Sequence, residues 1–409
     1  MSFAKGRSAI APIFLCWLSY TCAYLGRYSY SSNITAVIDT FSVNHSEAGL
    51  VTTLFFFAYG IGQIVNGLLC KRYNKRIMIA VALIISSAAN MAVFLGVPFC
   101  AFKYLWLLNG AAQSILWSTL IFVLSKNLRT EDLKKAVIVM STTVPIGTFI
   151  TYGFSSLMAI NGGYKYSFLL GTVVMSTAAV VWFLSYKKVF RGYAAEEKSI
   201  AVADMPKQCK SDFSLRVLMI VLGLLAVANN FVKDGMTTWV PSILKEKFGL
   251  HDSISILLTL TLPILGLFGA TCNTLLEKRI KSFTGLSFIW YFLTAVCIGL
   301  VILFGNNGIW QAVTVSFGLI SLFMHGVNNL ITSMAPLYMR DRINSGMLAG
   351  ILNGCCYVGS TISSYGLGVV ADRFGWNSIF LLLLFVCIFA CIISAFVAVR
   401  EFFLKEHNV

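Results

Sequence analysis

Two basic residues lie inside long apolar stretches, at matching positions in the two halves of the sequence. Arg27 lies in the segment CAYLGRY and Lys233 in the segment NNFVKDG. A charged side chain near the centre of a bilayer costs roughly 3 kcal/mol on insertion scales, so it is rarely retained without a use. The two positions are 233 − 27 = 206 residues apart in a chain of 409 residues. Two matched internal cations predict a binding site for one anion between them.

One acidic residue, Asp234, lies well inside an apolar stretch and directly follows Lys233. Adjacent residues of a helix point about 100° apart, so we expect these two side chains not to share a face. Three roles for Asp234 stay open. The first is a contact with Arg27 in the empty protein, the second is transport of a proton, and the third is a structural ion pair at the outer gate.

Other candidate binding residues are aromatic, amide or imidazole side chains at helical spacing within the apolar stretches. His325 and Asn329 are four residues apart and share a helix face, and Asn328 lies beside His325. Polar contacts between helices and ordinary packing are the competing interpretations for the whole set. Its members are Tyr24, Tyr28, Gln63, Gln113, Trp117, Trp239, His325, Asn328, Asn329, Asn353 and Tyr357.

The composition excludes a soluble globular protein. The chain is 58% hydrophobic and only 11% charged, whereas soluble domains carry about 25% charged residues. Apolar stretches long enough to cross a hydrocarbon core of ~30 Å recur along it. We expect twelve membrane helices, at 9–37, 47–69, 77–97, 102–125, 136–160, 166–186, 214–243, 254–275, 284–304, 309–338, 346–370 and 377–399.

The net charge of +15 is explained by membrane topology and not by nucleic-acid binding. Lys and Arg concentrate in alternate loops, and the opposite loops hold only Lys103, Lys165, Lys245, Lys247 and Arg373. By the positive-inside rule, both termini lie in the cytoplasm. We therefore expect a multi-pass protein of the plasma membrane, most simply a bacterial inner membrane, that functions as a monomer in the lipid bilayer.

The longest polar stretch divides the chain into two halves of six helices. We expect bundles at 1–186 and 214–409, joined by a cytoplasmic linker at 187–213. At the same offset of 206 residues, His45 matches His251 and Gly60 matches Gly266. The predicted fold is an all-α polytopic membrane protein with two pseudo-symmetric six-helix bundles. Two parallel six-helix repeats describe the major facilitator architecture.

No enzyme chemistry is predicted. The sequence has no Walker-type phosphate loop, no nucleophile with a base at catalytic spacing and no cluster with metal-ligand spacing. Its 11 cysteines lie mostly in apolar stretches, where a free thiol packs as a small hydrophobe. We expect no cofactor and no metal.

Several short motifs, collinear along the chain, resemble the organophosphate:phosphate antiporter family. The segment YLGR that ends at Arg27 is similar to that family's Tyr-Leu-x-Arg in helix one. The segment KDGMTTWVPSIL that begins at Lys233 resembles its helix-seven run, and Gln113-x3-Trp117 resembles a helix-four pair. The resemblance implies the major facilitator fold and exchange of glycerol phosphate or a hexose phosphate for inorganic phosphate.

The chain also departs from that family. Lys233 stands where members have Arg, and an ammonium lacks the planar fork that suits phosphate. Gln63 replaces a family Lys, and the family's helix-five histidine has no counterpart.

We therefore expect alternating-access exchange of a sugar-phosphate or glycerol-phosphate type organophosphate for inorganic phosphate. The alternatives are proton-coupled or exchange transport of a carboxylate or other small anion, and a transporter-like sugar-phosphate sensor.

Overall fold

The computed structural model describes residues 9–69, 72–160, 163–191, 213–280, 282–339, 343 and 345–406. Within these ranges the ordered elements are all helical. They are α1 (Ile10–Ser31), α2 (Ile34–Phe41), α3 (His45–Leu69), α4 (Lys75–Phe94), α5 (Phe99–Asn127), α6 (Thr130–Ser141), α7 (Thr143–Ala159), α8 (Lys165–Phe190), α9 (Phe213–Phe248), α10 (Asp252–Leu258), α11 (Thr261–Glu277), α12 (Phe283–Asn306), α13 (Trp310–Asn329), the π-helix η1 (Leu330–Met334), α14 (Ala335–Tyr338), α15 (Ser345–Phe374) and α16 (Trp376–Glu406).

These helices follow the twelve predicted membrane spans. Ten segments in the described part of the chain are long and apolar enough to cross a membrane. Two predicted spans remain. The first, 9–37, corresponds to α1 and the start of α2, and the second, 346–370, lies within α15. Both are rich in polar and small residues, which lowers their hydropathy. Helices that line a site between two bundles need fewer apolar residues than helices surrounded by lipid.

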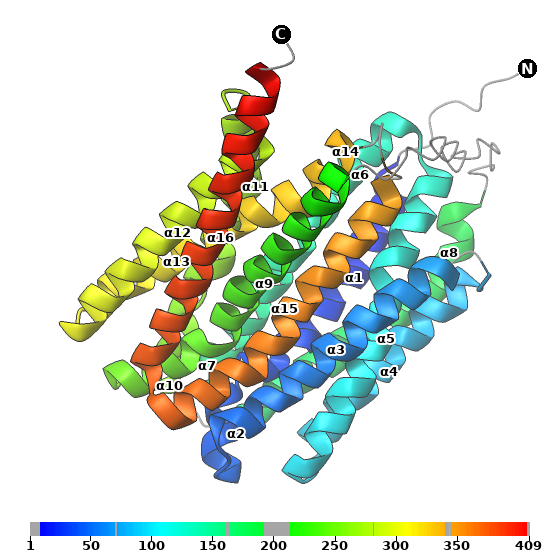
Figure 1. Ribbon diagram of the computed structural model, residues 1–409. Helices are drawn as coiled ribbons and strands as arrows, with labels where there is room; N and C mark the ends of the chain where they lie inside the picture. The colour runs from blue at the N-terminus through cyan, green and yellow to red at the C-terminus, as the bar shows by residue number, and fades with distance from the viewer. Residues whose placement is uncertain are drawn as a thin grey trace, which may run out of the picture.

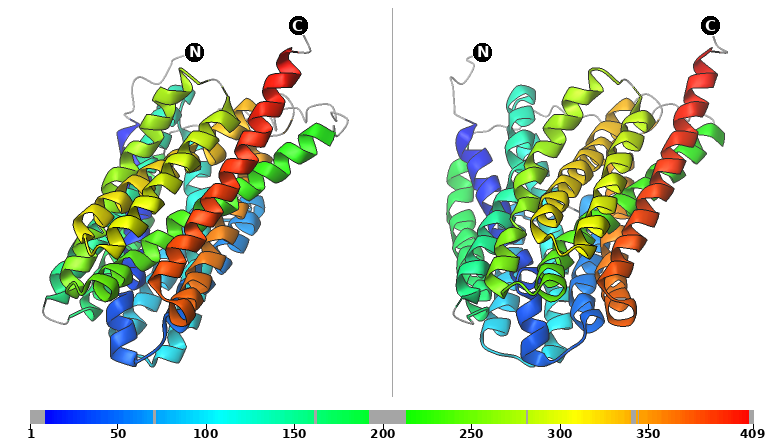
Figure 2. Two further views of the ribbon diagram at one scale, coloured as in Figure 1. Left: turned by 60° about the vertical axis from the view of Figure 1, so that its left-hand side comes forward. Right: turned by 90° about the vertical axis from the view of Figure 1, so that its left-hand side faces the viewer.

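The helices form two groups that meet along several seams. α3 packs against α15, and α7 packs against α10 and α11, so each half contributes helices to the contact (Figure 1). The start of α1 and the end of α16 lie at one end of the molecule (Figure 2). The opposite end, which holds α2, α10 and the junction of α15 with α16, is called the far end below.

The predicted division into bundles falls between α8 and α9. α8 continues to Phe190, a few residues into the predicted linker, and α9 begins at Phe213. Most of that linker, 192–212, lies outside the described residues.

Two helix breaks face the space between the halves. α7 begins at Thr143 and α11 at Thr261, each with a proline as its third residue, Pro145 and Pro263. Proline is tolerated in the first turn of a helix because the N–H that it lacks has no intrahelical partner there. Both prolines line the same internal cavity. The breaks therefore bring irregular backbone to the middle of the molecule.

Glycine allows the seam between α3 and α15 to close tightly at the far end. A Cβ atom at Gly49 would lie 2.3 Å from the backbone oxygen of Ser364, and one at Gly368 would lie 2.6 Å from the oxygen of His45. Real Cβ atoms do not approach that closely. Small residues at such positions let helix backbones approach each other in membranes.

Candidate anion-binding site between the two halves

A small cavity with both charged and apolar lining residues lies between the halves. Its volume is ≈ 40 Å³, far below the ~300 Å³ of a typical pocket for a small organic ligand, so it must widen to admit one. It is lined from both halves, by Tyr28, Val144, Pro145, Thr148, Tyr152, Lys233, Asp234, Thr237, Thr259, Leu262, Pro263, Ser321 and His325. Of the predicted site residues, four line it directly: Tyr28, Lys233, Asp234 and His325.

Arg27 is 5% exposed and lies among aromatic rings. Its guanidinium carbon is 4.2 Å from the ring centroid of Tyr59, 4.5 Å from that of Tyr24 and 4.9 Å from that of Phe55. Its Nε donates a hydrogen bond to Oε1 of Gln113 (3.2 Å). Among the residues that the structure describes, no carboxylate oxygen comes within 4.0 Å of it. Ring faces and one amide stabilise this cation without neutralising it.

The aromatic residues connect Arg27 to the cavity and to the other half. The Tyr24 ring stacks on that of Tyr28, with centroids 5.8 Å apart, and Tyr28 lines the cavity. On the other side, the Tyr59 ring lies 4.7 Å from that of Tyr357 on α15. The ring of Tyr24 thus separates Arg27 from the cavity-lining Tyr28. The ring of Tyr59 separates it from Tyr357 of the second half.

Gln63 and Asn353 meet across the seam. Nε2 of Gln63 donates to the hydroxyl of Tyr59 (2.8 Å), and Asn353 donates to the Oε1 of Gln63. The predicted residues Gln63, Asn353 and Tyr357 therefore gather beside Tyr59, next to Arg27.

Lys233 has a carboxylate partner, in contrast to Arg27. The distance from its Nζ to Oδ1 of Asp234 is 3.5 Å. The two residues start from different faces of the helix, and the flexible lysine stem brings the ammonium back to the neighbouring carboxylate. Oδ2 of Asp234 also accepts from Nδ2 of Asn230 (3.1 Å) and from the hydroxyl of Ser360 on α15. Asp234 does not reach Arg27 here.

A second pair of residues at the same offset shows how the halves face each other. Asp39 in α2 forms an ion pair with Lys245 in α9, and 245 − 39 = 206, the same offset as 233 − 27. Asp39 lies twelve positions after Arg27 and Lys245 twelve positions after Lys233 (39 − 27 and 245 − 233). Equivalent positions of two parallel repeats face each other across their common axis. This pairing supports the matching of Arg27 with Lys233.

The remaining predicted residues lie further from the cavity. Trp117 packs on Tyr20, with centroids 5.1 Å apart. Oδ1 of Asn328 accepts from Asn229 (3.3 Å), and Oδ1 of Asn329 accepts from Asn273 (3.1 Å). These two amides make the interhelical polar contacts that were the competing interpretation.

Trp239 lies in the contact at the far end. Its indole N–H donates to the backbone oxygen of Ser364 (3.2 Å), and its ring centroid is 5.7 Å from that of His45. It does not line the cavity.

Sequence reasoning missed several residues of this site: Tyr59, Tyr152, Asn230 and Ser360. A spacing signal existed for three of them. Tyr59 precedes Gln63 by four residues, Asn230 precedes Asp234 by four, and Ser360 follows Tyr357 by three, so each shares a helix face with a predicted residue. Tyr152 carries no such signal, because it reaches the site only through helix packing.

A cluster of charged residues joins the halves at the far end. His45 contacts Glu246 through Nε2 (2.9 Å) and Asp372 through Nδ1 (2.7 Å). The carboxylate of Asp372 also accepts from the backbone N–H groups of His45 (2.9 Å) and Ser46 (2.8 Å) at the start of α3. A residue of one half therefore caps a helix of the other. With these contacts made, the far end is closed.

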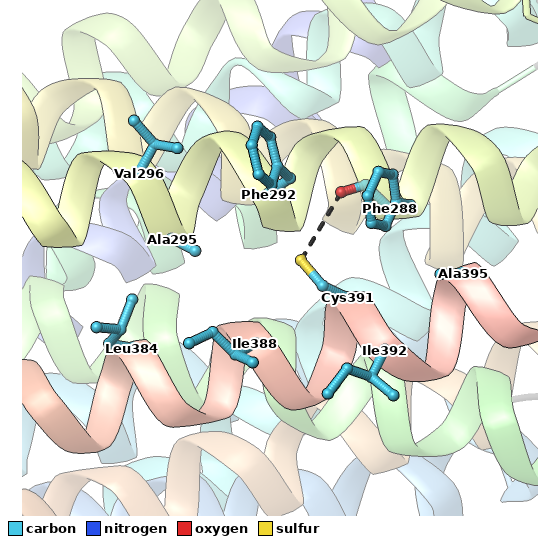
Figure 3. Close-up of a pocket in the computed structure, with 9 residues that line it drawn as sticks. All are labelled: Phe288, Phe292, Ala295, Val296, Leu384, Ile388, Cys391, Ile392 and Ala395. Atoms are coloured by element: carbon cyan, nitrogen blue, oxygen red, sulfur yellow. Dashed lines mark hydrogen bonds between the residues drawn. The ribbon is translucent and has the colours of Figure 1, made fainter.

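A larger hollow lies elsewhere and has different chemistry. It measures ≈ 430 Å³ and lies between α12 and α16, lined by apolar side chains such as Phe292, Leu384 and Ile388 (Figure 3). Cys391 donates a weak hydrogen bond to the backbone oxygen of Phe288 there (3.9 Å). None of the predicted site residues lines it. A surface of this kind suits lipid chains, and it offers an anion no partner.

Comparison with known proteins agrees with the architecture. The family model described as Major Facilitator Superfamily matches residues 16–345. The chain is 22% identical to the hexuronate transporter of Bacillus subtilis (strain 168), over 91% of this chain and 90% of that protein. It is also 22% identical to the probable hexose phosphate transport protein of Chlamydia pneumoniae, over 90% and 86% respectively. The crystal structure of a bacterial homolog to the human lysosomal transporter Spinster, inward-facing and occupied, superimposes with a TM-score of 0.77 at 14% identity, covering 95% of this chain and 96% of that one.

Proposed function

The chain belongs to the major facilitator superfamily, and we propose that it exchanges a sugar-phosphate type organophosphate for inorganic phosphate by alternating access. Arg27 and Lys233 would bind the anionic group from the two halves. The similarity to the hexose phosphate transport protein, together with the helix-one and helix-seven motifs, supports this substrate class.

The observation that carries the proposal is the state of Arg27. A guanidinium that is buried in apolar surroundings and has no carboxylate partner is costly in a membrane protein. An anion that enters the space between the halves would supply the missing negative charge and the acceptor oxygens that the fork-shaped guanidinium suits.

The same charge accounts for obligate exchange. Without an anion, movement of the halves carries the charge of Arg27, which no described carboxylate neutralises, through a low-dielectric interior, and this opposes the movement. A bound anion removes this barrier, so the loaded carrier changes conformation more readily than the empty one. A ligand shifts such an equilibrium only by binding one state better than the other, and here it binds the state in which both cations reach it.

The test is counterflow in vesicles that contain the purified protein. Arg27→Gln is expected to lower exchange of hexose phosphate for phosphate at least ~100-fold, because a charge-assisted contact is lost in a low-dielectric site. Arg129→Gln, which removes an exposed arginine, is the matched control and retains exchange. Undiminished counterflow in Arg27→Gln refutes the proposal.

A second candidate is exchange or proton-coupled transport of a carboxylate. The observation that favours it is the Lys233–Asp234 pair in the cavity, which places a carboxylate, the group needed to carry a proton, beside one of the two cations. The similarity to the hexuronate transporter points in the same direction. Uptake of a hexuronate that is driven by an imposed pH gradient, and lost in Asp234→Asn, would select this candidate.

The location is part of the same proposal. The loops rich in Lys and Arg favour cytoplasmic termini in a plasma membrane, most simply a bacterial inner membrane, with the far end outside. We also propose that the monomer transports, because the site lies between the two halves of one chain. Labelling of the partly exposed Lys103, at the far end, from outside intact cells tests the orientation.

A further inference from the structure

The two cations of the site differ in their carboxylate partners: Lys233 has Asp234 beside it, and no described carboxylate contacts Arg27. Asp234 is 7% exposed and accepts from Asn230 on its own helix and from Ser360 on α15. Ser360 is itself fully buried. The carboxylate is therefore fixed by donors from two helices beside Lys233, at 3.5 Å from its Nζ. Such an arrangement holds the negative charge in place when a ligand arrives.

The formal charge of the site follows from these residues. Arg27 and Lys233 contribute two positive charges and Asp234 one negative charge, which leaves +1. His325 is counted as a neutral imidazole, with its Nδ1 donating to the backbone oxygen of Ser321 (2.8 Å). Among the described residues that line the cavity there is no further Asp, Glu, Lys or Arg.

We infer that Asp234 is a built-in counter-anion that makes this site select singly charged substrates over doubly charged ones, an inference that rests on the proposed function. A monoanion brings the site to neutrality, whereas a dianion leaves an excess negative charge at low dielectric, next to a carboxylate that cannot leave. The substrate class is a hexose that carries one negative charge, either a carboxylate or a phosphate ester in its singly protonated form.

Two probes of similar size separate charge from shape. A hexose 6-sulfate carries one negative charge at any working pH. At pH 8 a hexose 6-phosphate is about 99% doubly charged, since its second pKa is ≈ 6. Binding of both, and of the uncharged hexose, is measured by calorimetry on the full chain in nanodiscs at pH 8. The wild-type protein is expected to bind the sulfate about tenfold more tightly than the phosphate.

A series of variants changes the charge of the site in known steps. Asp234→Asn raises it to +2 and is expected to tighten phosphate binding at least tenfold, with a change below threefold for the sulfate. The double variant Lys233→Gln/Asp234→Asn returns it to +1 and is expected to restore the preference for the sulfate. Asp39→Asn removes a carboxylate at the far end and is the matched control, with an unchanged ratio.

The outcomes separate the inference from the function that it refines. If the wild-type protein prefers the phosphate, the inference is overturned and the proposed function stands. The conclusion is the same if the ratio of sulfate to phosphate affinity does not change in Asp234→Asn. If neither charged probe binds better than the uncharged hexose, the proposed function itself fails. Should Asp234→Asn not fold, the wild-type ratio and the charge-matched double variant still decide.

Discussion

The surroundings of Arg27 and of Lys233 differ although the two residues occupy matching positions. Arg27 lies among the rings of Tyr24, Phe55 and Tyr59, and no described carboxylate contacts it. Lys233 lines the cavity and has Asp234 at 3.5 Å. One half therefore presents a fixed, uncompensated cation, and the other presents a flexible cation with its own counter-ion.

This difference indicates a division of roles between the halves. Ring faces hold a guanidinium in one orientation and leave its charge available, so Arg27 is suited to bind an anion directly. By the inference proposed above, the Lys233–Asp234 pair in the second half would set how much negative charge the site accepts. Four experiments test this division of roles, and they are given in order of decreasing expected effect.

The largest effect, on the stability of the protein, is expected when the ion pair between Lys233 and Asp234 is broken. Lys233→Gln leaves Asp234 without a cation, and we expect the free energy of unfolding to fall by about 2 kcal/mol. This is less than the ~3–5 kcal/mol for breaking a buried pair, because Asn230 and Ser360 still donate to the carboxylate. Thermal unfolding in detergent measures it.

The double variant Lys233→Gln/Asp234→Asn should recover at least half of that loss. Lys126→Gln, at an exposed position, should lose none. A double variant less stable than Lys233→Gln would contradict the pairing.

Exchange of the two cation types tests the division directly. Arg27→Lys is expected to lower counterflow about tenfold, because an ammonium gives up the stacked, planar geometry and the hydrogen bond to Gln113. Lys233→Arg should stay within about threefold of wild type, since a guanidinium there still reaches Asp234. Equal losses in the two variants would show that the halves are equivalent.

A smaller effect is expected for the amide that orients Arg27. Gln113 accepts from Arg27 Nε and donates to Asn109 (3.0 Å) and to the backbone oxygen of Ala23 (3.1 Å), so it holds the guanidinium in place. Gln113→Leu should weaken binding of the anionic substrate about fivefold, the equivalent of one hydrogen bond of ~1 kcal/mol. Gln311→Leu, at an exposed position, is the control. An unchanged affinity for the anionic substrate would show that the aromatic rings alone hold Arg27 in its orientation.

The two histidines at offset 206 give the smallest expected effect. His45 bridges Glu246 and Asp372 of the other half, whereas His251 contacts Ser253 two residues away. We expect His45→Gln to raise the population with an open far end about threefold, since it weakens contacts worth ~0.2–1 kcal/mol each at exposed positions. His251→Gln should change nothing. Distances between spin labels at Glu47 and Arg373 report the opening, and a similar shift in both variants would refute the role of His45.

Much of this architecture follows from the sequence, for a simple physical reason. In a bilayer every backbone polar group must be satisfied within its own segment, so a stretch of about 20 apolar residues is a helix whatever surrounds it. The offset of 206 residues then predicted that Arg27 and Lys233 are equivalent positions of two repeats. Charge in an apolar stretch is costly enough that its mere presence marked both residues as functional candidates.

Which side chains touch these cations was decided by the tertiary structure. Tyr59 and Ser360 come from helices that the sequence places far from Arg27 and Asp234, and packing alone brings them within reach. The same holds for Trp239, whose motif suggested the site and whose position is the far-end contact. Lys233 and Asp234 are adjacent in the sequence, but they form an ion pair only because the flexible lysine side chain bends back. Helical spacing alone does not predict this ion pair. The amino-acid pattern was enough to predict that two cations lie within membrane-spanning stretches, because a run of apolar residues is itself what places a segment in a bilayer. Only the fold decided that one of them is neutralised, since an ion pair depends on distances of a few ångströms.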